Sequence, residues 1–256
     1  MTHITTPAML DGRRAIVTGA SRNLGAEVAF ALARHGAKVA INYRGSAAEA
    51  EAVLTTLEEY GPGHVAVEGD VSSSAEVTSM IDSAATWLGG LDVVVNNAGP
   101  YGATPIMEAD DSEWERVVDA NLKGTWLCTK AAIPHLRAST DGRVVNLSAV
   151  SARVRNRGAY GLAKDAVEVL TEELALELAP YATVNAVAPG QVAESLDELS
   201  SYDQQWAQAV RDRTPRGRLV TRAELAEAVA VICTAAFSSM TGTVLRFDGG
   251  LGLNRF

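Results

Sequence analysis

The sequence predicts a doubly wound α/β fold, in which one parallel sheet carries helices on both faces. Two observations predict it. Seven short runs rich in valine and isoleucine recur along the whole chain, and segments whose apolar residues repeat at helical spacing separate them. Such runs are typical of strands buried on both faces, as in a parallel sheet. Alternation of strand and helix with right-handed crossovers then places the carboxyl ends of the strands along one edge.

The expected strands are residues 14–18, 38–42, 64–68, 91–96, 143–147, 183–187 and 243–247. The expected helices are residues 27–34, 47–59, 75–88, 111–133, 161–179 and 223–234. No linker, repeat or low-complexity tract interrupts this order, so we expect residues 1–256 to form a single domain. Residues 191–219 are polar and lie between the last two strands; they predict one or two short helices that can act as a lid over the site.

The composition narrows the class of protein. Hydrophobic residues make up 47% and charged residues 21%, which is the ordinary globular range. A net charge of −9 argues against nucleic acid and anionic membranes as partners. Cys128 and Cys233 lie in apolar stretches and are expected to be buried thiols, and the four histidines are too scattered to predict a metal site. Residues 1–10 lack the pattern of a signal peptide and no apolar run reaches the length of a membrane span, so we expect a cytoplasmic protein.

A glycine-containing turn follows the first strand and leads into the first helix. Two glycines allow a sharp turn and a close approach to a pyrophosphate, while the helix amino terminus supplies free N–H groups. A tight turn without a ligand is the alternative. The residues expected to bind the cofactor here are Gly19, Ser21, Arg22, Asn23, Leu24 and Gly25.

The end of the second strand bears on which dinucleotide binds. Asn42 stands where an NAD site carries an acidic residue that holds the ribose 2′-hydroxyl, so the repulsion against a 2′-phosphate is absent. Arg22 and Arg44 can supply positive charge and paired hydrogen bonds to that phosphate, although both can also be ordinary surface residues. We therefore expect NADP(H), with further contacts from Tyr43 and Ser46.

Tyr160 and Lys164 are four residues apart and share one face of a predicted helix. A nearby ammonium favours the phenolate and lowers the pKa of a tyrosine. The pair can therefore exchange a proton with a carbonyl oxygen. This spacing often occurs by chance on a surface helix, so the pair needs support from elsewhere in the chain.

That support comes from a series of motifs in a fixed order. The chain resembles the short-chain dehydrogenase/reductase family over residues 13–250. The resemblance is carried by TGASRNLG at 18–25, Asp70-Val71, NNAG at 96–99, Asn121, YGLAK from Tyr160, Pro189-Gly190 and DGG at 248–250. It implies a Rossmann-type fold of about seven strands, an oxidoreductase activity, a homotetramer and a set of residue roles.

The resemblance implies that Tyr160 protonates the substrate oxygen, that Lys164 binds the nicotinamide ribose and lowers the Tyr160 pKa, and that Asn121 anchors a water in a proton relay. A helix hydrogen bond is the alternative for Asn121, and a helix N-cap is the alternative for Asp70. The remaining implied cofactor contacts are Asp70 and Val71 to adenine, Asn97, Ala98 and Gly99 to ribose, and Pro189 and Gly190 to the carboxamide.

Two positions depart from the family pattern. Asn23 replaces the middle glycine of the phosphate turn, and asparagine tolerates the left-handed conformation better than most residues. Ala149 stands where the family usually carries a serine that hydrogen-bonds the substrate oxygen. Ser148 is the first candidate to replace that serine and Ser151 the second.

Over most of its length the chain also resembles family members that reduce 3-oxoacyl thioesters, so the expected substrate is a small or carrier-bound carbonyl compound. Arg153, Arg155 and Arg157 can attract an anionic substrate or carrier, or form a solvated loop or subunit contact. Residues 42–50 and NNAGPYGATP also resemble pteridine reductases, and Pro100, Tyr101 and Trp206 can face a ring or pack in the core or lid. Sugar, polyol and aromatic polyketide substrates stay open. An NADP-binding regulatory protein with little turnover, or a structural module without cofactor, are the alternatives of another class.

Overall fold

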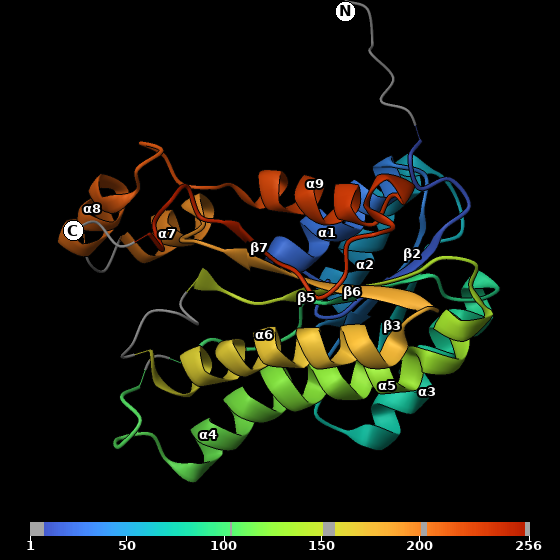
Figure 1. Cartoon of the computed structure of the whole chain (residues 1–256), viewed down its shortest axis with the longest axis horizontal. Helices are drawn as coiled ribbons and strands as arrows, with labels where there is room; N and C mark the ends of the chain where they lie inside the picture. Colours follow the sequence, from blue (N-terminus) through green and yellow to red (C-terminus); the bar gives the residue numbers. More distant parts are fainter. Residues whose placement is uncertain (1–7, 103, 151–156, 201–203, 254–256) are drawn as a thin grey trace, which may run out of the picture.

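The computed structural model describes residues 8–102, 104–150, 157–200 and 204–253. They form a seven-stranded sheet in the order β3-β2-β1-β4-β5-β6-β7, with every neighbouring pair parallel and helices on both faces (Figure 1). The predicted fold is confirmed. The strands are β1 (Arg14–Val17), β2 (Lys38–Tyr43), β3 (Val65–Glu68), β4 (Val93–Asn96), β5 (Gly142–Leu147), β6 (Ala182–Pro189) and β7 (Val244–Phe247).

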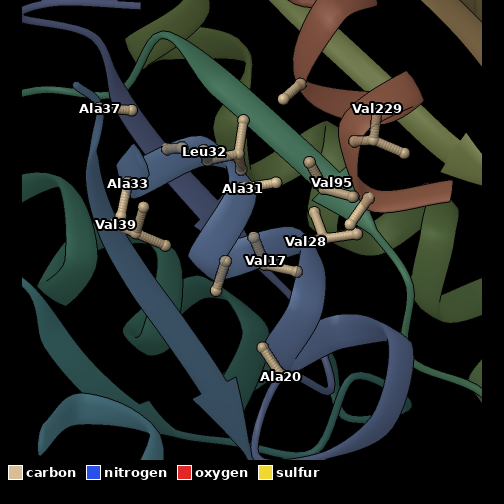
Figure 2. Packing of buried hydrophobic residues seen from close by; sticks show 14 of the residues in the cluster. Val17, Ala20, Val28, Ala31, Leu32, Ala33, Ala37, Val39, Val95 and Val229 are labelled. Atoms are coloured by element: carbon tan, nitrogen blue, oxygen red, sulfur yellow. The ribbon is translucent and has the colours of Figure 1, made fainter. Parts of the chain in front are cut away.

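Two helical layers cover the sheet. One face carries α1 (Asn23–Arg34), α2 (Ala47–Leu57) and α9 (Arg222–Ile232), and the other carries α3 (Ser74–Leu88), α5 (Gly124–Ala138) and α6 (Gly158–Leu178) (Figure 1). Figure 2 shows how small side chains allow α1 to lie close to β1 and β4: Val28, Ala31 and Leu32 pack beside Val17 and Val95. This close packing fixes the amino terminus of α1 at the edge of the sheet.

The strand order reverses between β1 and β4. The chain builds β2 and β3 on one side of β1 and then returns to build β4 to β7 on the other side. Val17 is paired with Ile41 and with Val95, so the turns after β1, β2 and β4 leave the sheet at the same edge. Ligands of doubly wound sheets bind in the crevice at this switch point.

One predicted helix is interrupted. The sequence predicts a continuous helix over 111–133, whereas the structure has α4 (Asp111–Val118), a π-helical turn η2 (Asp119–Lys123) and α5. The π turn accommodates one extra residue per turn and leaves the apolar spacing on either side unchanged, so the pattern cannot reveal it. The helix also continues through Pro134 to Ala138, where the prediction ended it.

The segment between β6 and β7 contains two short helices, as predicted: α7 (Ala193–Ser200) and α8 (Gln204–Arg213). They lie together at one end of the molecule (Figure 1). Leu196, Ala207 and Leu219 form a small apolar cluster of their own there. The side chain of Trp206 lies outside the described part of the chain, and the lid role stays a prediction.

Candidate active site

The turn after β1 has the geometry of a phosphate cradle. A Cβ on Gly25 would lie 2.4 Å from the Gly19 carbonyl oxygen and 2.6 Å from Asn97 Nδ2, so only glycine fits the start of α1. Gly19 has a φ of +62°, and a Cβ there would lie 2.9 Å from Ala98 Cα. Asn23 has a φ of 53°, which confirms that asparagine takes the left-handed position of the replaced glycine.

Hydrogen bonds join this turn to the end of β4. Asn97 Nδ2 donates to the carbonyl oxygens of Thr18, at 3.0 Å, and Gly19, at 3.1 Å. The Thr18 hydroxyl accepts from the backbone N–H groups of Asn97 and Ala98, each at 3.0 Å. Asn97 and Ala98 therefore shape the cradle, which leaves the adjacent Gly99 backbone as the open part of the motif.

The Asn42 side chain is buried, and both atoms of its amide group make hydrogen bonds within the protein. Its Oδ1 accepts from the Gly19 N–H at 3.1 Å, and its Nδ2 donates to the Gly69 carbonyl oxygen at 2.9 Å. The amide therefore holds the ends of β1, β2 and β3 together. The hydroxyls of Ser21 and Ser46 lie 2.9 Å apart and join the phosphate turn to the start of α2.

Arg44 and Asp70 form an ion pair at this edge, with 2.9 Å between Nη1 and Oδ2. The Arg44 side chain is 67% exposed, so the contact is screened and contributes little to stability. Burial disfavours the Asp70 carboxylate, but hydrogen bonds from Ser72 and the contact with Arg44 outweigh it, and the pKa of Asp70 lies below its usual value. The two residues that the sequence assigns to the 2′-phosphate and to adenine thus contact each other.

A cavity of about 500 Å³ lies along the turns that follow β1, β2, β3 and β4. It contains most of the residues that the sequence assigns to cofactor binding. The described residues that line it are Gly19, Ser21, Arg22, Asn23, Leu24, Gly25, Asn42, Tyr43, Arg44, Ser46, Gly69, Asp70, Val71, Asn97, Ala98, Gly99, Pro100, Tyr101, Arg116 and Ala120. Four other residues assigned to the cofactor lie outside this set: Pro189 and Gly190 at the end of β6, and Tyr160 and Lys164 on α6.

Tyr160 and Lys164 lie one turn apart on α6, as the sequence predicts. The Lys164 ammonium is buried, donates to the Leu147 carbonyl oxygen at 2.6 Å, and lies 5.7 Å from the centre of the Tyr160 ring. Burial lowers the pKa of Lys164 to about 8. The sequence predicts a lowered pKa for Tyr160. In the structure, burial raises the pKa of Tyr160 to about 12, with a smaller electrostatic contribution from Tyr101.

Asn121 lies in the π-helical turn and is fully buried. Its Nδ2 donates to the carbonyl oxygens of Pro100 and Val117, both at 2.9 Å. Its buried Oδ1 has no hydrogen-bond partner among the described residues and lies 2.1 Å from the position that a Cβ on Gly99 would take. Asn121 therefore supports the loop after β4 and retains one acceptor directed at the Gly99 backbone.

Ser148 does not have the geometry that its predicted role requires. Its hydroxyl is buried and lies 3.1 Å from both the Lys164 carbonyl oxygen and Glu168 Oε1, because the strand exit turns this side chain onto α6. Ala149 is buried as well. Ser151, Arg153 and Arg155 lie outside the described residues, so their predicted roles stay untested.

The comparisons with known proteins agree with this geometry. Residues 19–252 match the family model described as enoyl-(acyl carrier protein) reductase. The 3-oxoacyl-(acyl-carrier-protein) reductase FabG of Staphylococcus aureus is 35% identical over 93% of this chain and 98% of its own. The chain belongs to the short-chain dehydrogenase/reductase family. The resemblance stated from the motifs is confirmed, and the protein is an oxidoreductase of this family.

Solved structures of the family superpose closely on this one. A short-chain dehydrogenase of Burkholderia cenocepacia J2315, in complex with NADP, has a TM-score of 0.86 and 32% identity, covering 95% of this chain and 99% of its own. A doubly substituted short-chain dehydrogenase/reductase of Serratia marcescens has a TM-score of 0.87 and 30% identity, covering 95% of this chain and 99% of its own.

Several residues of this family member that shape the site were missed from the sequence. Gly69, Arg116 and Ala120 line the cavity without being predicted. Tyr101 was proposed only as apolar surface, yet its ring lies 5.0 Å from that of Tyr160 in an edge-to-face arrangement. A tyrosine two residues after the NNAG turn is the one signal that could have identified it, because such turns end at the ligand-binding edge.

The arrangement brings a phenol, a buried ammonium and a cavity of about 500 Å³ to one edge of the sheet. Since the Lys164 ammonium faces both the Leu147 carbonyl and the Tyr160 ring, it can stabilise negative charge on that phenol. Among the described helices, none is both long enough and apolar enough to cross a lipid bilayer.

Proposed function

We propose that this protein is an NADP(H)-dependent ketoreductase, in which Tyr160 protonates the oxygen of a substrate carbonyl. The observation that carries the proposal is the position of Tyr160 and Lys164, which lie one turn apart on α6. The ammonium is held at the carboxyl end of β5, the edge of the sheet where the cavity lies, and the Tyr160 ring contacts Tyr101, which lines that cavity. Bound nicotinamide would supply the hydride that a carbonyl carbon accepts.

The chain fits a dinucleotide at two independent places. At Gly19 and Gly25 the backbone leaves no room for a Cβ, as a pyrophosphate site requires, and the amino terminus of α1 points N–H groups at the same cradle. At Asn121 the unpaired Oδ1 faces the Gly99 backbone, which lines the cavity. Gly19 to Gly25 would bind the phosphates, Asp70 and Val71 the adenine, and Lys164 the nicotinamide ribose.

Charge at the cavity mouth supports NADP(H) over NAD(H). Arg22 and Arg44 both line the cavity and are exposed to solvent, and neither Asn42 nor Tyr43 at the end of β2 carries a negative charge. Asp70 holds Arg44 in place and lowers its net attraction for an anion. The NADP-bound relative from Burkholderia cenocepacia is consistent with this choice.

The resting protonation states suit reduction. Burial holds Tyr160 as a neutral phenol, with a pKa of about 12, so the proton is present before the substrate oxygen gains charge. The buried ammonium of Lys164, next to the ring, then stabilises the phenolate that is left after transfer. The reverse direction, oxidation of an alcohol, uses the same groups with the phenolate as base.

A 3-oxoacyl thioester is the first substrate to test, because the Staphylococcus aureus relative is named for this reaction. Pteridine, sugar and polyol substrates remain the alternatives. Since the matching family model is described as an enoyl reductase, a 2-enoyl thioester belongs in the same panel. Reduction of the enoyl but not the oxo compound would refute the ketoreductase assignment.

The homotetramer and the cytoplasmic location are part of this proposal. Leu162, Val169 and Leu176 are exposed on α6 at a spacing of seven residues, and Trp126 is exposed on α5. An apolar stripe of this kind marks a subunit interface. Sedimentation of the wild type and of Leu176→Arg tests it, since the variant is expected to dissociate.

Cofactor choice is tested by titrating the protein with NADPH and NADH and following fluorescence. The variant Arg44→Asp is expected to reduce the preference for NADPH about 10- to 100-fold, as expected for loss of a hydrogen-bonded charge pair and gain of a repulsive one. Arg137→Asp, the same charge change on the exposed end of α5, is the control and should leave the preference unchanged. An unaltered preference in Arg44→Asp would refute the role of Arg44.

Turnover is tested with the carbonyl panel and with Tyr160→Phe, which should lose at least 100-fold in kcat while binding NADPH normally. Binding of NADPH without reduction of any compound, and no effect of the variant, would favour the regulatory alternative. Absence of NADPH binding would refute both and leave a structural module.

A further inference from the structure

Among the residues that the structure describes, no serine takes the place of the second hydroxyl that members of this family usually carry beside the catalytic tyrosine. Ala149 occupies that position and is 7% exposed, with only a methyl group to offer. The neighbouring Ser148 hydroxyl is held against α6 by the Lys164 carbonyl oxygen and Glu168. The substrate oxygen therefore needs a donor from elsewhere, or it must do without one.

Tyr101 carries a phenol hydroxyl next to Tyr160. It lines the cavity, its residue is 56% exposed, and its ring centre lies 5.0 Å from that of Tyr160 with 70° between the ring planes. Within the part of the chain that the structure describes, its hydroxyl has no hydrogen-bond partner, so it is available to a ligand. The two phenols also influence each other electrostatically, since Tyr101 contributes to the raised pKa of Tyr160.

The loop that carries Tyr101 is fixed on both sides. On one side, Asn121 Nδ2 donates to the Pro100 carbonyl oxygen at 2.9 Å. On the other, Gly102 lies so close to α4 that a Cβ there would be 2.7 Å from Val117 Cγ2. A third contact joins the loop to α6 itself: a Cβ on Gly158 would lie 2.4 Å from the Thr104 carbonyl oxygen. The edge-to-face contact between the two tyrosines is thus set by backbone packing.

We propose that Tyr101 is the second hydrogen-bond donor to the substrate oxygen and replaces the serine missing at position 149. The inference rests on the proposed ketoreductase function. In the step, the carbonyl carbon gains a hydride with its electron pair from NADPH, the C=O π pair moves to oxygen, and the oxygen takes the Tyr160 proton, which yields the alcohol and NADP⁺. Tyr101 donates a hydrogen bond throughout and keeps its own proton.

The substitution Tyr101→Phe keeps the ring contact and removes only the hydroxyl. Loss of one such donor costs about 100- to 1,000-fold in kcat in enzymes that stabilise an oxyanion. We expect a loss of about 100-fold in kcat, little change in KM for the carbonyl substrate, and unchanged NADPH affinity. Tyr60→Phe is the control, because Tyr60 is an exposed tyrosine in the 3-10 turn after α2 (Glu58–Tyr60) and does not line the cavity.

Rescue distinguishes a donor from a merely structural tyrosine. The double variant Tyr101→Phe with Ala149→Ser restores a hydroxyl at the family position and is expected to recover at least tenfold in kcat.

Each failure has a separate signature. If Tyr101→Phe loses less than threefold in kcat, or loses only in KM, the donor role of Tyr101 is wrong. A large loss in Ser151→Ala with Tyr101→Phe intact would assign the donor to Ser151 instead. A wild type that binds NADPH but reduces no carbonyl compound refutes the proposed function itself, and the role of Tyr101 with it.

Discussion

The cradle at the start of α1 allows a quantitative test through Gly25→Ala. In a helix, alanine is about 1 kcal/mol more favourable than glycine, so without crowding the variant would be more stable than the wild type. The added Cβ would instead lie 2.4 Å from the Gly19 carbonyl oxygen and 2.9 Å from Ala20 Cα, which are backbone atoms that no rotamer change can move. Overpacking of this kind costs about 1–3 kcal/mol or more.

Because both contacts are far inside ordinary van der Waals distance, we take the upper end of that range. The net loss is then about 2 kcal/mol, which for a chain of this size lowers Tm by roughly 4–8 °C. The same displacement moves the Gly19 backbone out of the phosphate cradle, so NADPH affinity should fall at least tenfold. Thermal melting followed by fluorescence, with and without NADPH, measures both effects.

The control is Gly89→Ala at the end of α3. Gly89 has a φ of +76° with open space around it, so the cost there is the left-handed strain of about 1–2 kcal/mol, and NADPH affinity should be unchanged. If Gly25→Ala melts at or above the wild-type temperature and binds NADPH within twofold of normal, close backbone approach is not what requires glycine at position 25.

Three further predictions concern buried polar groups. In Lys164→Met, the free energy of unfolding should depend less on pH than in the wild type. Burial lowers the Lys164 pKa from 10.5 to about 8, so between these pH values the unfolded wild type binds one proton more than the folded protein, and its free energy of unfolding rises with pH. Urea titrations at pH 8 and pH 10 would show this difference, and the same pH dependence in variant and wild type would refute it. Asn121→Ala leaves the Pro100 and Val117 carbonyls without their donor and should lower the free energy of unfolding by about 1–3 kcal/mol. An unchanged urea midpoint would contradict a stabilising role for these two hydrogen bonds. Burial disfavours the Asp92 carboxylate, but hydrogen bonds from Arg14 and Ser139 outweigh this effect and lower the pKa of Asp92. The carboxylate therefore stabilises the fold at pH above the ordinary pKa of aspartate, and this contribution is lost as the pH falls. Asp92→Asn should make the free energy of unfolding fall less steeply at acid pH, and an equally steep fall would contradict the prediction.

The fold could be predicted because its signals are local. Buried strands such as Val93–Asn96 are continuous apolar runs, and their alternation with helices determines the topology with few alternatives. The phosphate turn was predicted for the same reason. Its backbone needs positive φ angles, and glycine and asparagine, the residue types that adopt them most readily, occupy positions 19 and 23.

The parts that were missed depend on orientation and on distant partners. Ser148 is adjacent to the family's serine position, and the sequence does not reveal that the strand exit turns its side chain onto α6. The ion pair between Arg44 and Asp70 joins two turns that are distant in the sequence. The sequence therefore assigned each residue to a part of the cofactor and did not predict that the two contact each other. The lowered Tyr160 pKa was wrong because burial of the phenol, which the sequence does not reveal, raises its pKa, and Tyr101 raises it further.

The π-helical turn at Asp119–Lys123 has a consequence for how this chain can vary in length. It holds one residue more than a regular helix needs, and each residue of a helix advances by about 100° around its axis. Deleting a residue here would give a regular α-helix, but it would rotate either Val117 or Asn121 out of the protein interior, where both side chains are now buried. The irregular turn is therefore a spacer whose length must be kept, and insertions or deletions should be tolerated in the surface turns well before they are tolerated within it.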